Sequence, residues 1–575
     1  YLPGTQIAGR LREVATRLAP ALGWDPCVAL ERDRRKDGEG RPLPCGCRVC
    51  SLFGDRRPPE GEDAGAAPAA VVARASRLWC FDAPLERAGQ VIVRDGVGID
   101  RRTGTSAAQA RALWDAEWIA AGARFTLRLE LEHGASVDDE VVLALALSEW
   151  VEGRGRIGRG ASRGGGAFTL EGGTFRRATL ETVPDLLAFL HADALDRGAV
   201  VEGWLDERLR ALRADTSKAG FGHVLPAGAT GSFVRICFDL CFRGPVLVND
   251  PVAALAHGLS FAPVFAGSAW ERPVLPGASL RGVLRAQVER IARTLAARQA
   301  AASPEAAAGF ARLCAACSVF VTAAAEKENE HHALRSCAER AEAHGREDAD
   351  PAEAEERCLG CTLFGSTRIG SRLRIADAEL GDKAAPVFRL RDFVAIDRFT
   401  GGALEHAKFD ALPLYDPVFR VSMELEAPDA SGWELGALAL ALRDLDDGLA
   451  TVGAHGSRGF GRARVEGVEL RLGRIGVRGP EPLPDAVEVG WSGVFRRVDR
   501  APCDAAGLVS AAREAGWIDA FVTLCREVER REDVDPATVQ DDYFGRTLLA
   551  QPSPVGMEAL YPLTVDLAEL EEAHG

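Results

Sequence analysis

The chain has 575 residues, 47% of them apolar and 27% charged, with a formal net charge of −15. This composition excludes a disordered protein, and the length exceeds one ordinary hydrophobic core, so at least two domains are expected. The sequence contains no apolar run of bilayer length and no secretory leader, which predicts a cytoplasmic protein.

The acidic excess argues against a nucleic-acid ligand, because phosphate contacts normally come from a basic face. The acids, however, concentrate in stretches such as 347–356. Four arginines instead share a Gly-rich stretch without acids, namely Arg154, Arg156, Arg159 and Arg163. The local potential can therefore differ from the average.

The first predicted element is a helix over 7–18, opened by the turn Leu2-Pro3-Gly4. The chain starts at Tyr1 rather than Met, which suggests that the sequence begins inside a longer reading frame. A Pro/Gly/Arg-rich stretch follows that has too few apolar residues to fold by burial alone, and it contains Cys27, Cys45, Cys47 and Cys50. Four thiolates there predict a closed, tetrahedral zinc site of the structural kind.

Alternating apolar residues next predict a strand over 125–131, and an apolar run predicts a helix over 141–150. A Gly-rich loop follows, with Ser162-Arg163-Gly164 near its end. Residues 179–221 are interpreted as helices joined by polar turns, which makes them a linker with its own apolar face.

The second half opens with a predicted strand over 232–242, and Pro276-Gly277-Ala278-Ser279-Leu280-Arg281-Gly282 leads into a helix over 283–295. Two C-x-x-C pairs then flank a long charged insertion, and they consist of Cys314, Cys317, Cys358 and Cys361. This pattern predicts a second structural zinc site, in which Cys337 or one of His331 and His332 could replace a ligand.

Several of these patterns occur twice in the same order, which indicates an internal repeat. Both halves contain a Pro-Gly turn before a helix, C-x-x-C-x-L-F-G, R-D-x-V-x-I-D-R followed by Thr-Gly, alternating strands, an apolar helix and S-R-G. The shared segments are Cys47–Gly54 with Cys358–Gly365, Arg94–Arg101 with Arg391–Arg398, and Ser162–Gly164 with Ser457–Gly459.

These residues resemble the RAMP proteins, in particular the backbone subunits of Csm- and Cmr-type complexes in type III CRISPR systems, here as a tandem fusion of the III-D or III-E kind. The resemblance covers 1–171 and 231–472, leaving 172–230 as a helical linker and 473–575 as an extension of unknown role. It implies an α+β fold of two tandem ferredoxin-like, RRM-like β-α-β-β-α-β domains. Each would carry a zinc knuckle and a projecting hairpin, and the first would be N-terminally truncated.

The resemblance also implies which residues contact RNA. The turn that opens the first helix would lie beside the guide, through Gly277, Ser279 and Arg281, and through Gly4 and Arg10 in the first copy. Helix N-terminal amides suit a phosphate, although an ordinary capped helix explains the same residues. Arg163 and Arg458 of the Gly-rich loops would reach the backbone, and Arg101 and Arg398 would lie in the hairpins, where a structural turn is the alternative.

Target cleavage in such proteins depends on an aspartate in the loop after the first strand, and in the second copy that loop contains only Asp250. Asp250 is therefore the candidate catalytic residue, with Mg²⁺ as its cofactor. In Asn249-Asp250-Pro251 it is equally a turn former. His257 is a candidate proton-transfer group with a surface role as its alternative.

The expected function is that of a guide-RNA-binding backbone subunit that positions complementary target RNA among other effector subunits. Metal-dependent endoribonuclease cleavage of that target is left open. The alternatives are a guide-RNA processing endoribonuclease and a zinc-stabilised protein scaffold without RNA.

Overall fold

The computed structural model describes most of both halves of the chain. The described residues are 1–26, 47–54, 75–216, 231–300, 316–317, 337 and 358–526, with short gaps at 88, 100–105, 107–112, 133–134, 194–195, 267–271, 367–368, 382–385 and 477–478. Within these ranges no helix is both long and apolar enough to cross a membrane.

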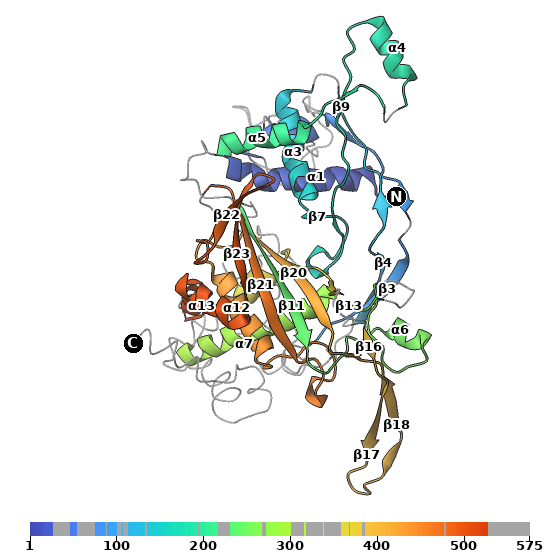
Figure 1. Ribbon diagram of the computed structural model, residues 1–575, viewed down its shortest axis with the longest axis vertical. Coiled ribbons are helices and arrows are strands. Elements are labelled where there is room, and N and C mark those ends of the chain that lie inside the picture. Colours follow the sequence, from blue (N-terminus) through green and yellow to red (C-terminus); the bar gives the residue numbers. More distant parts are fainter. Residues whose placement is uncertain are drawn as a thin grey trace, which may run out of the picture.

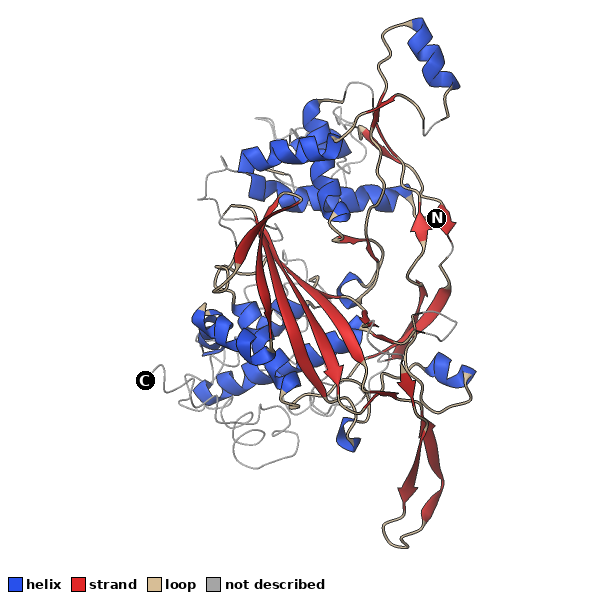
Figure 2. Ribbon diagram, in the orientation of Figure 1, coloured by secondary structure: helices blue, strands red, loops and turns tan. Residues whose placement is uncertain are grey.

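The second half is built on an antiparallel sheet, which contains eight strands among the described residues (Figure 2). Its order is β13-β15-β20-β11-β21-β23-β22, and β14 also pairs with β20. The strands are β11 (Ser232–Phe242), β13 (Val274–Leu275), β14 (Leu373–Ile375), β15 (Ala378–Leu380), β20 (Val418–Glu426), β21 (Ala463–Arg474), β22 (Val487–Ser492) and β23 (Phe495–Cys503).

One face of this sheet is covered by helices because its strands alternate apolar and polar side chains. On β11, Phe238 and Leu240 are fully buried, whereas Arg235 and Asp239 on the other face are partly exposed. The covering helices are α7 (Gly277–Ala300) and α12 (Trp433–Asp446), and α13 (Ala505–Glu514) and α14 (Trp517–Arg526) pack against α12 (Figure 1).

The first half has its own hydrophobic core between helices. Ile7 and Leu11 of α1 (Gly4–Leu18), Val142 and Trp150 of α3 (Val137–Val151) and Leu52 of α2 (Arg48–Phe53) meet there. The expected strand over 125–131 is divided into β5 (Arg124–Phe125) and β6 (Leu129–Leu131), and β6 pairs with β1 (Leu78–Cys80). The remaining short elements here are η1 (Ala19–Leu22), β2 (Leu85–Arg87), β7 (Gly155–Arg156), η2 (Ala161–Arg163) and β8 (Ala167–Phe168).

Each half also carries a two-stranded hairpin. The first consists of β3 (Val91–Val97) and β4 (Leu113–Ile119), and the second of β17 (Arg391–Ile396) and β18 (Ala403–Ala411), which projects from the body (Figure 1). Near the base of the second lie β16 (Val387–Phe388) and α6 (Pro251–Ala256) (Figure 1). Strand β16 pairs with β19 (Leu414–Tyr415), which also pairs with β12 (Pro245–Val246). The small elements α11 (Leu359–Phe364) and η3 (Gly456–Arg458) belong to the second half.

The predicted linker contains α4 (Val183–His191) and α5 (Trp204–Thr216), as its periodicity indicated, together with the pair β9 (Arg176–Arg177) and β10 (Ala199–Val200). Trp204 of α5 is buried in the core of the first half, and Leu209 and Leu212 are buried in a cluster that joins the first half to Phe233 and Phe495. In contrast, α4 has no buried residue.

The part of the C-terminal stretch that the structure describes completes the second half and reaches the first. Strand β23 pairs with β21, and the β22–β23 turn lies against the loop after α3. Ser492 donates its hydroxyl to Glu152 at 2.7 Å, and the Arg154 guanidinium lies 4.1 Å and 4.7 Å from the ring centroids of Phe233 and Phe495. The stretch therefore links both halves.

Candidate nucleic-acid interface and metal centre

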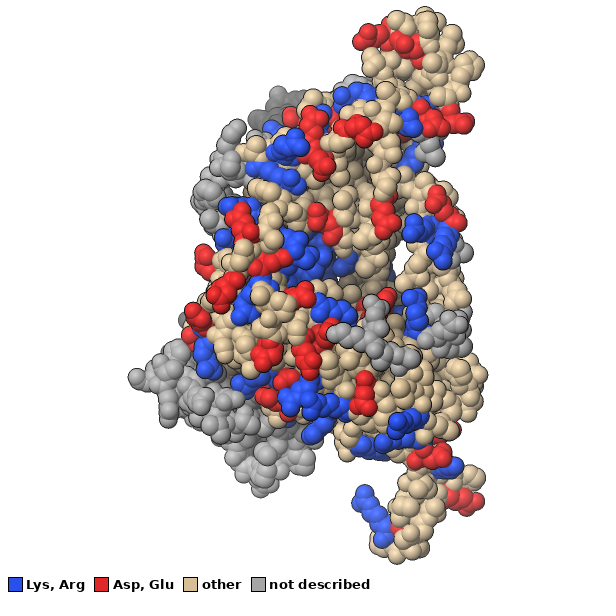
Figure 3. Space-filling view, in the orientation of Figure 1, with Lys and Arg blue, Asp and Glu red and all other residues tan. Residues whose placement is uncertain are grey.

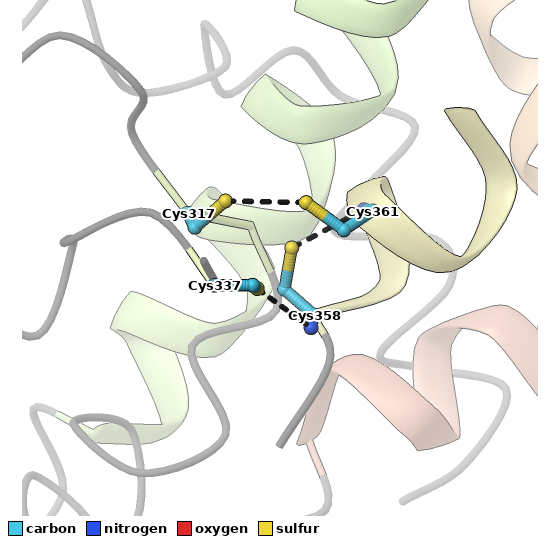
Figure 4. Close-up of side chains that lie close together, drawn as sticks. All are labelled: Cys317, Cys337, Cys358 and Cys361. Carbon is cyan, nitrogen blue, oxygen red and sulfur yellow. Dashed lines mark hydrogen bonds between the residues drawn. The ribbon is translucent and has the colours of Figure 1, made fainter. Parts of the chain in front are cut away.

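Four cysteines of the second half converge beside α7. The sulfur atoms of Cys317, Cys337, Cys358 and Cys361 all lie within 4.8 Å of one another (Figure 4). Cys358 is the N-cap residue of α11, and the Cys361 amide donates to its sulfur at 3.3 Å. Hydrogen bonding with Cys337 and burial raise the pKa of Cys317 far above its ordinary value. A cation that binds thiolates would favour the deprotonated form of these buried cysteines.

The donor set fits tetrahedral zinc, because four thiolates close the coordination sphere and leave no position for water. Cys337 takes part in the cluster, as one of the alternatives anticipated, and Cys314 lies outside the described residues. The Nη2 atom of Arg285, on α7, lies 3.4 Å from the Cys361 sulfur. Such an N–H···S contact orients a ligand from outside the coordination sphere.

The first half reproduces half of this arrangement. Cys47 is the N-cap residue of α2, and the Cys50 amide donates to its sulfur at 3.3 Å. The Nη2 atom of Arg12 lies 3.2 Å from the Cys50 sulfur, as that of Arg285 lies against the Cys361 sulfur in the second half. The other two predicted ligands, Cys27 and Cys45, lie outside the described residues.

The Pro-Gly turns have a packing explanation. A Cβ atom on Gly4 would lie 2.1 Å from the Cys80 carbonyl oxygen, and one on Gly277 would lie 2.3 Å from that of Ile375. Only glycine therefore allows each helix to begin so close to the neighbouring strand. The Gly4 amide donates to Asp82 at 2.7 Å.

The predicted RNA ligands around the second turn already have protein partners. The Gly277 amide donates to Asp377 at 2.9 Å, and Nη2 of Arg281 donates to the Phe364 carbonyl. Ser279 is half-buried in the first turn of α7. In the first half, Arg10 donates from Nε to the Arg156 carbonyl at 2.8 Å. A phosphate at either helix start would have to share these groups.

Asp82 and Asp377, which accept from the amides at the two helix starts, belong to a repeated motif that sequence reasoning missed. Ser76–Ala83 and Ser371–Ala378 share S-R-L-x-x-x-D-A, and each serine donates to a leucine carbonyl of the preceding L-F-G segment. The aspartate of the motif, Asp82 or Asp377, accepts from the amide at the helix start. The signal was present in the sequence as a direct repeat.

The two hairpins pair in the same register. Asp95 lies opposite Asp115 and Asp392 lies opposite Asp410, with an arginine one residue before Asp95 and Asp392 in each hairpin. Because like charges directly opposite are destabilising, their occurrence in both hairpins is not explained by strand pairing. The Asp410 carboxylate accepts from the Ser260 amide at 2.6 Å.

The tip of the second hairpin is a turn closed by a carboxylate. Asp397 accepts from the amides of Phe399 and Thr400, each at 2.8 Å, and these bonds lower its pKa. Arg398 is exposed, and the Phe399 side chain is 100% exposed. The turn therefore presents a cation and a ring to solvent, while Asp100 and Arg101 lie outside the described residues.

The S-R-G arginines lie over aromatic rings of the hairpins. The Arg163 guanidinium is 5.5 Å from the Trp114 ring centroid, and that of Arg458 is 5.3 Å from Phe409 and 5.6 Å from Phe393. Both arginines are exposed. Trp114 and Phe409 occupy equivalent positions, each two residues before the alanine that faces the first-strand arginine. Exposed cations stacked on rings suit a nucleic acid.

Asp250 caps α6 in the loop after β11. Its Oδ1 accepts from the amides of Val252 at 3.0 Å and Ala253 at 3.1 Å. Burial, and to a lesser degree the charge of Asp95, raise the pKa of Asp250 even though these amides lower it. Helix α6 contacts β3 of the first hairpin, which places its N-cap residue Asp250 at the joint of the two halves. His257 is exposed at the end of the same helix.

The two halves meet in a network of ion pairs. Arg94 of the first hairpin pairs with Asp377, and both side chains are 21% exposed. Basic side chains also gather in the hollow between α1 and the sheet (Figure 3). Arg17 of α1 lies 3.4 Å from Glu426 of β20, and Arg374 lies 2.7 Å from the same carboxylate. The Arg94–Asp377 and Arg17–Glu426 pairs thus join charged groups of the two halves.

Comparison with known proteins agrees with the repeat. The family model of the RAMP superfamily matches residues 1–169 and 261–464, and no curated protein matches the chain. The match includes both cysteine motifs, both hairpins and both S-R-G loops. Membership implies a CRISPR-associated, RNA-binding role alongside effector subunits. The chain therefore belongs to the RAMP superfamily, with a match in each of its two halves.

Proposed function

We propose that the chain is a guide-RNA-binding backbone subunit of a type III CRISPR effector complex and that it presents the guide to complementary target RNA. The observation that carries this proposal is the equivalence of the two hairpins. Each pairs in the same register and holds an exposed S-R-G arginine over an aromatic ring. Two equivalent sites along one chain suit a regular polymer such as RNA.

The topology supports a ferredoxin-like domain in the second half. In a β-α-β-β-α-β unit the strands lie side by side in the order fourth, first, third, second. The order β21, β11, β20 and then β14 with β15 agrees with this, if β14 and β15 together count as the second strand. Both helices lie on one face, as in a β-α-β-β-α-β unit. We propose the same domain type for the first half, with domains at 1–171 and 231–472, a linker at 172–230 and an extension at 473–575.

Structural zinc in each half is part of the proposal. In the second half the ligands would be Cys317, Cys337, Cys358 and Cys361, whose sulfurs are already grouped. In the first half Cys47 and Cys50 hold the same local geometry. Zinc would stabilise the fold there and would supply no open coordination position.

Target cleavage would depend on Asp250. A carboxylate beside the joint of the two halves could hold Mg²⁺ near a phosphate of the bound strand, because hard cations prefer oxygen ligands. The contact of α6 with β3 of the first hairpin and the raised pKa of Asp250 are the observations that favour a role beyond capping.

The test is to purify the complete reading frame with its co-expressed neighbours and to sequence the extracted nucleic acid. Uniform short RNAs with a CRISPR repeat tag would support the proposal. A zinc-loaded protein free of RNA would overturn it in favour of a protein scaffold.

Site variants sharpen this test. Replacing Arg163 and Arg458 together by Glu should weaken guide binding, and loss of each phosphate contact should reduce the salt slope of log K by roughly 0.7. Arg513→Glu, an exposed substitution on α13, is the matched control. An unchanged salt slope would contradict the assigned contacts.

A guide-processing endoribonuclease is the second candidate, and one histidine favours it. His455, three residues before Arg458, adopts a left-handed conformation with φ of 62°, and its Nδ1 lies 3.1 Å from Arg458. Strained residues persist where the surroundings enforce them. Cleavage of precursor RNA without added metal, abolished by His455→Ala, would establish this activity.

A further inference from the structure

Helix α4 forms the end of an arm that leaves the body of the protein (Figure 1). The root of the arm is firmly held. Phe175 stacks on Trp204 with ring centroids 4.2 Å apart, and Trp204 Nε1 donates to Glu140 at 2.9 Å. Strands β9 and β10 pair above this root. The arm is therefore anchored to the body by side-chain packing and hydrogen bonds at its root.

The helix at its end carries an uncovered apolar stripe. Val183, Leu186, Leu187 and Leu190 are 69%, 43%, 50% and 59% exposed. Their spacing of i, i+3, i+4 and i+7 places them on one face of the helix. This is the spacing with which a short helix anchors in a groove of another protein.

The helix needs a partner for thermodynamic reasons. It has nine residues and a capping box between Thr182 and Asp185, but none of its residues is buried. Isolated helices shorter than about 12–15 residues are marginally stable in water. The capping box defines where the helix begins, and burial of the stripe would supply the missing stabilisation.

The charge around the stripe narrows the choice of partner. Residues 178–196 contain four acids, Glu181, Asp185, Asp193 and Asp196, and no lysine or arginine. The Arg197 guanidinium, which follows this segment, lies 4.7 Å from the Phe189 ring centroid. Figure 3 shows acidic side chains without basic ones at the tip of the arm. Nucleic acids and anionic lipid surfaces would be repelled, because both require a basic face.

A symmetric contact between two copies of α4 is too small. A nine-residue helix is about 14 Å long at roughly 1.5 Å per residue. Two such helices side by side would bury far less than the roughly 1,200 Å² of stable interfaces. A concave surface can instead surround the stripe on several sides.

We propose that α4 is a docking helix that inserts its stripe into an apolar groove, rimmed by basic residues, on another protein. This inference does not rest on the proposed RNA function, and RNA binding could fail while the docking stands. The linker would thereby attach a further subunit outside the two RAMP domains.

The experiment places a photo-crosslinking residue at Leu187, or at Ala188 on the opposite face, in the full chain expressed with its neighbouring genes. We expect residue 187, but not 188, to crosslink to one protein, at a peptide with apolar residues flanked by lysine or arginine. Crosslinks from 187 to a second copy of this chain, to RNA or to lipid, or none at all, would overturn the proposal.

Binding of the purified crosslinked protein then provides a quantitative check. The double variant Leu187→Glu/Leu190→Glu should weaken binding at least 100-fold, since two buried leucines are lost. Ala188→Glu adds one charge to the exposed opposite face and should change binding less than about threefold. Since the stripe is exposed, neither variant should unfold the body. Equal effects of the two variants would refute groove binding.

Discussion

Replacing Asp377 by Ala should destabilise the start of α7 far more than Asp82→Ala destabilises the start of α1. Both carboxylates accept the first amide of a helix, which contributes about 1 kcal/mol for an exposed cap. Asp377 is also largely buried and pairs with Arg94. A charged, half-buried hydrogen bond contributes about 2 kcal/mol and the ion pair about 1 kcal/mol. We therefore expect losses of about 3 kcal/mol at Asp377 and about 1 kcal/mol at Asp82.

The assay is native-state hydrogen exchange of the first turns of the two helices. A loss of about 3 kcal/mol corresponds to roughly 100-fold faster exchange at α7. Asp377→Asn keeps an acceptor for Gly277 and removes only the charge, so it should cost about 1 kcal/mol. Combining it with Arg94→Ala should add little further loss. Equal exchange in Asp82→Ala and Asp377→Ala, or full additivity with Arg94→Ala, would refute a joint that stabilises α7.

Four further outcomes are expected. Metal analysis should find two zinc ions per chain and one in Cys361→Ser, with a lower melting temperature; an unchanged zinc content would remove Cys361 from the ligand set. Asp250→Asn should retain the α6 cap and the melting temperature but abolish Mg²⁺-dependent target cleavage, whereas persistent cleavage would leave Asp250 a cap alone. Phe399→Ala should leave the melting temperature unchanged, because the side chain is fully exposed, and should alter the pattern of target protection in footprinting; an unchanged footprint would exclude a wedge role. Burial raises the pKa of Asp139, but hydrogen bonds from Ser136 and Arg77 bring this pKa below its ordinary value. The stabilisation by the Asp139 carboxylate is therefore complete above about pH 4 and is lost as the pH falls through the lowered pKa. Between pH 5 and 3 the melting temperature should accordingly fall less steeply in Asp139→Asn than in the unchanged protein.

The helices of the two repeats were predictable because their local signals agree. The Pro-Gly turns mark the starts of α1 and α7, and apolar periodicity extends each helix to Leu18 or beyond Leu295. The equivalence of the two hairpin segments was predictable from the direct repeat of R-D-x-V-x-I-D-R, whereas the hairpin shape was an expectation from the family resemblance. In each case the residues that decide the structure are neighbours in sequence.

Other parts of the site depended on contacts between distant residues. Cys337 is 21 residues from Cys358, and no spacing rule selects it over a histidine of the same insertion. Arg281 was expected to contact RNA, and the structure adds that its guanidinium donates to the Phe364 carbonyl. Its direction depends on the packing of α11 against α7, which the motif does not describe.

The sequence by itself determined the repeat, the order of its elements and the pairs of cysteines, since short-range periodicity and spacing encode them. Only the tertiary structure decided that Arg94 meets Asp377, 283 residues away, and that the β22–β23 turn contacts the loop after α3. Those contacts arise because the apolar faces of both halves must pack together, and the packing brings charged groups from separate strands to one joint.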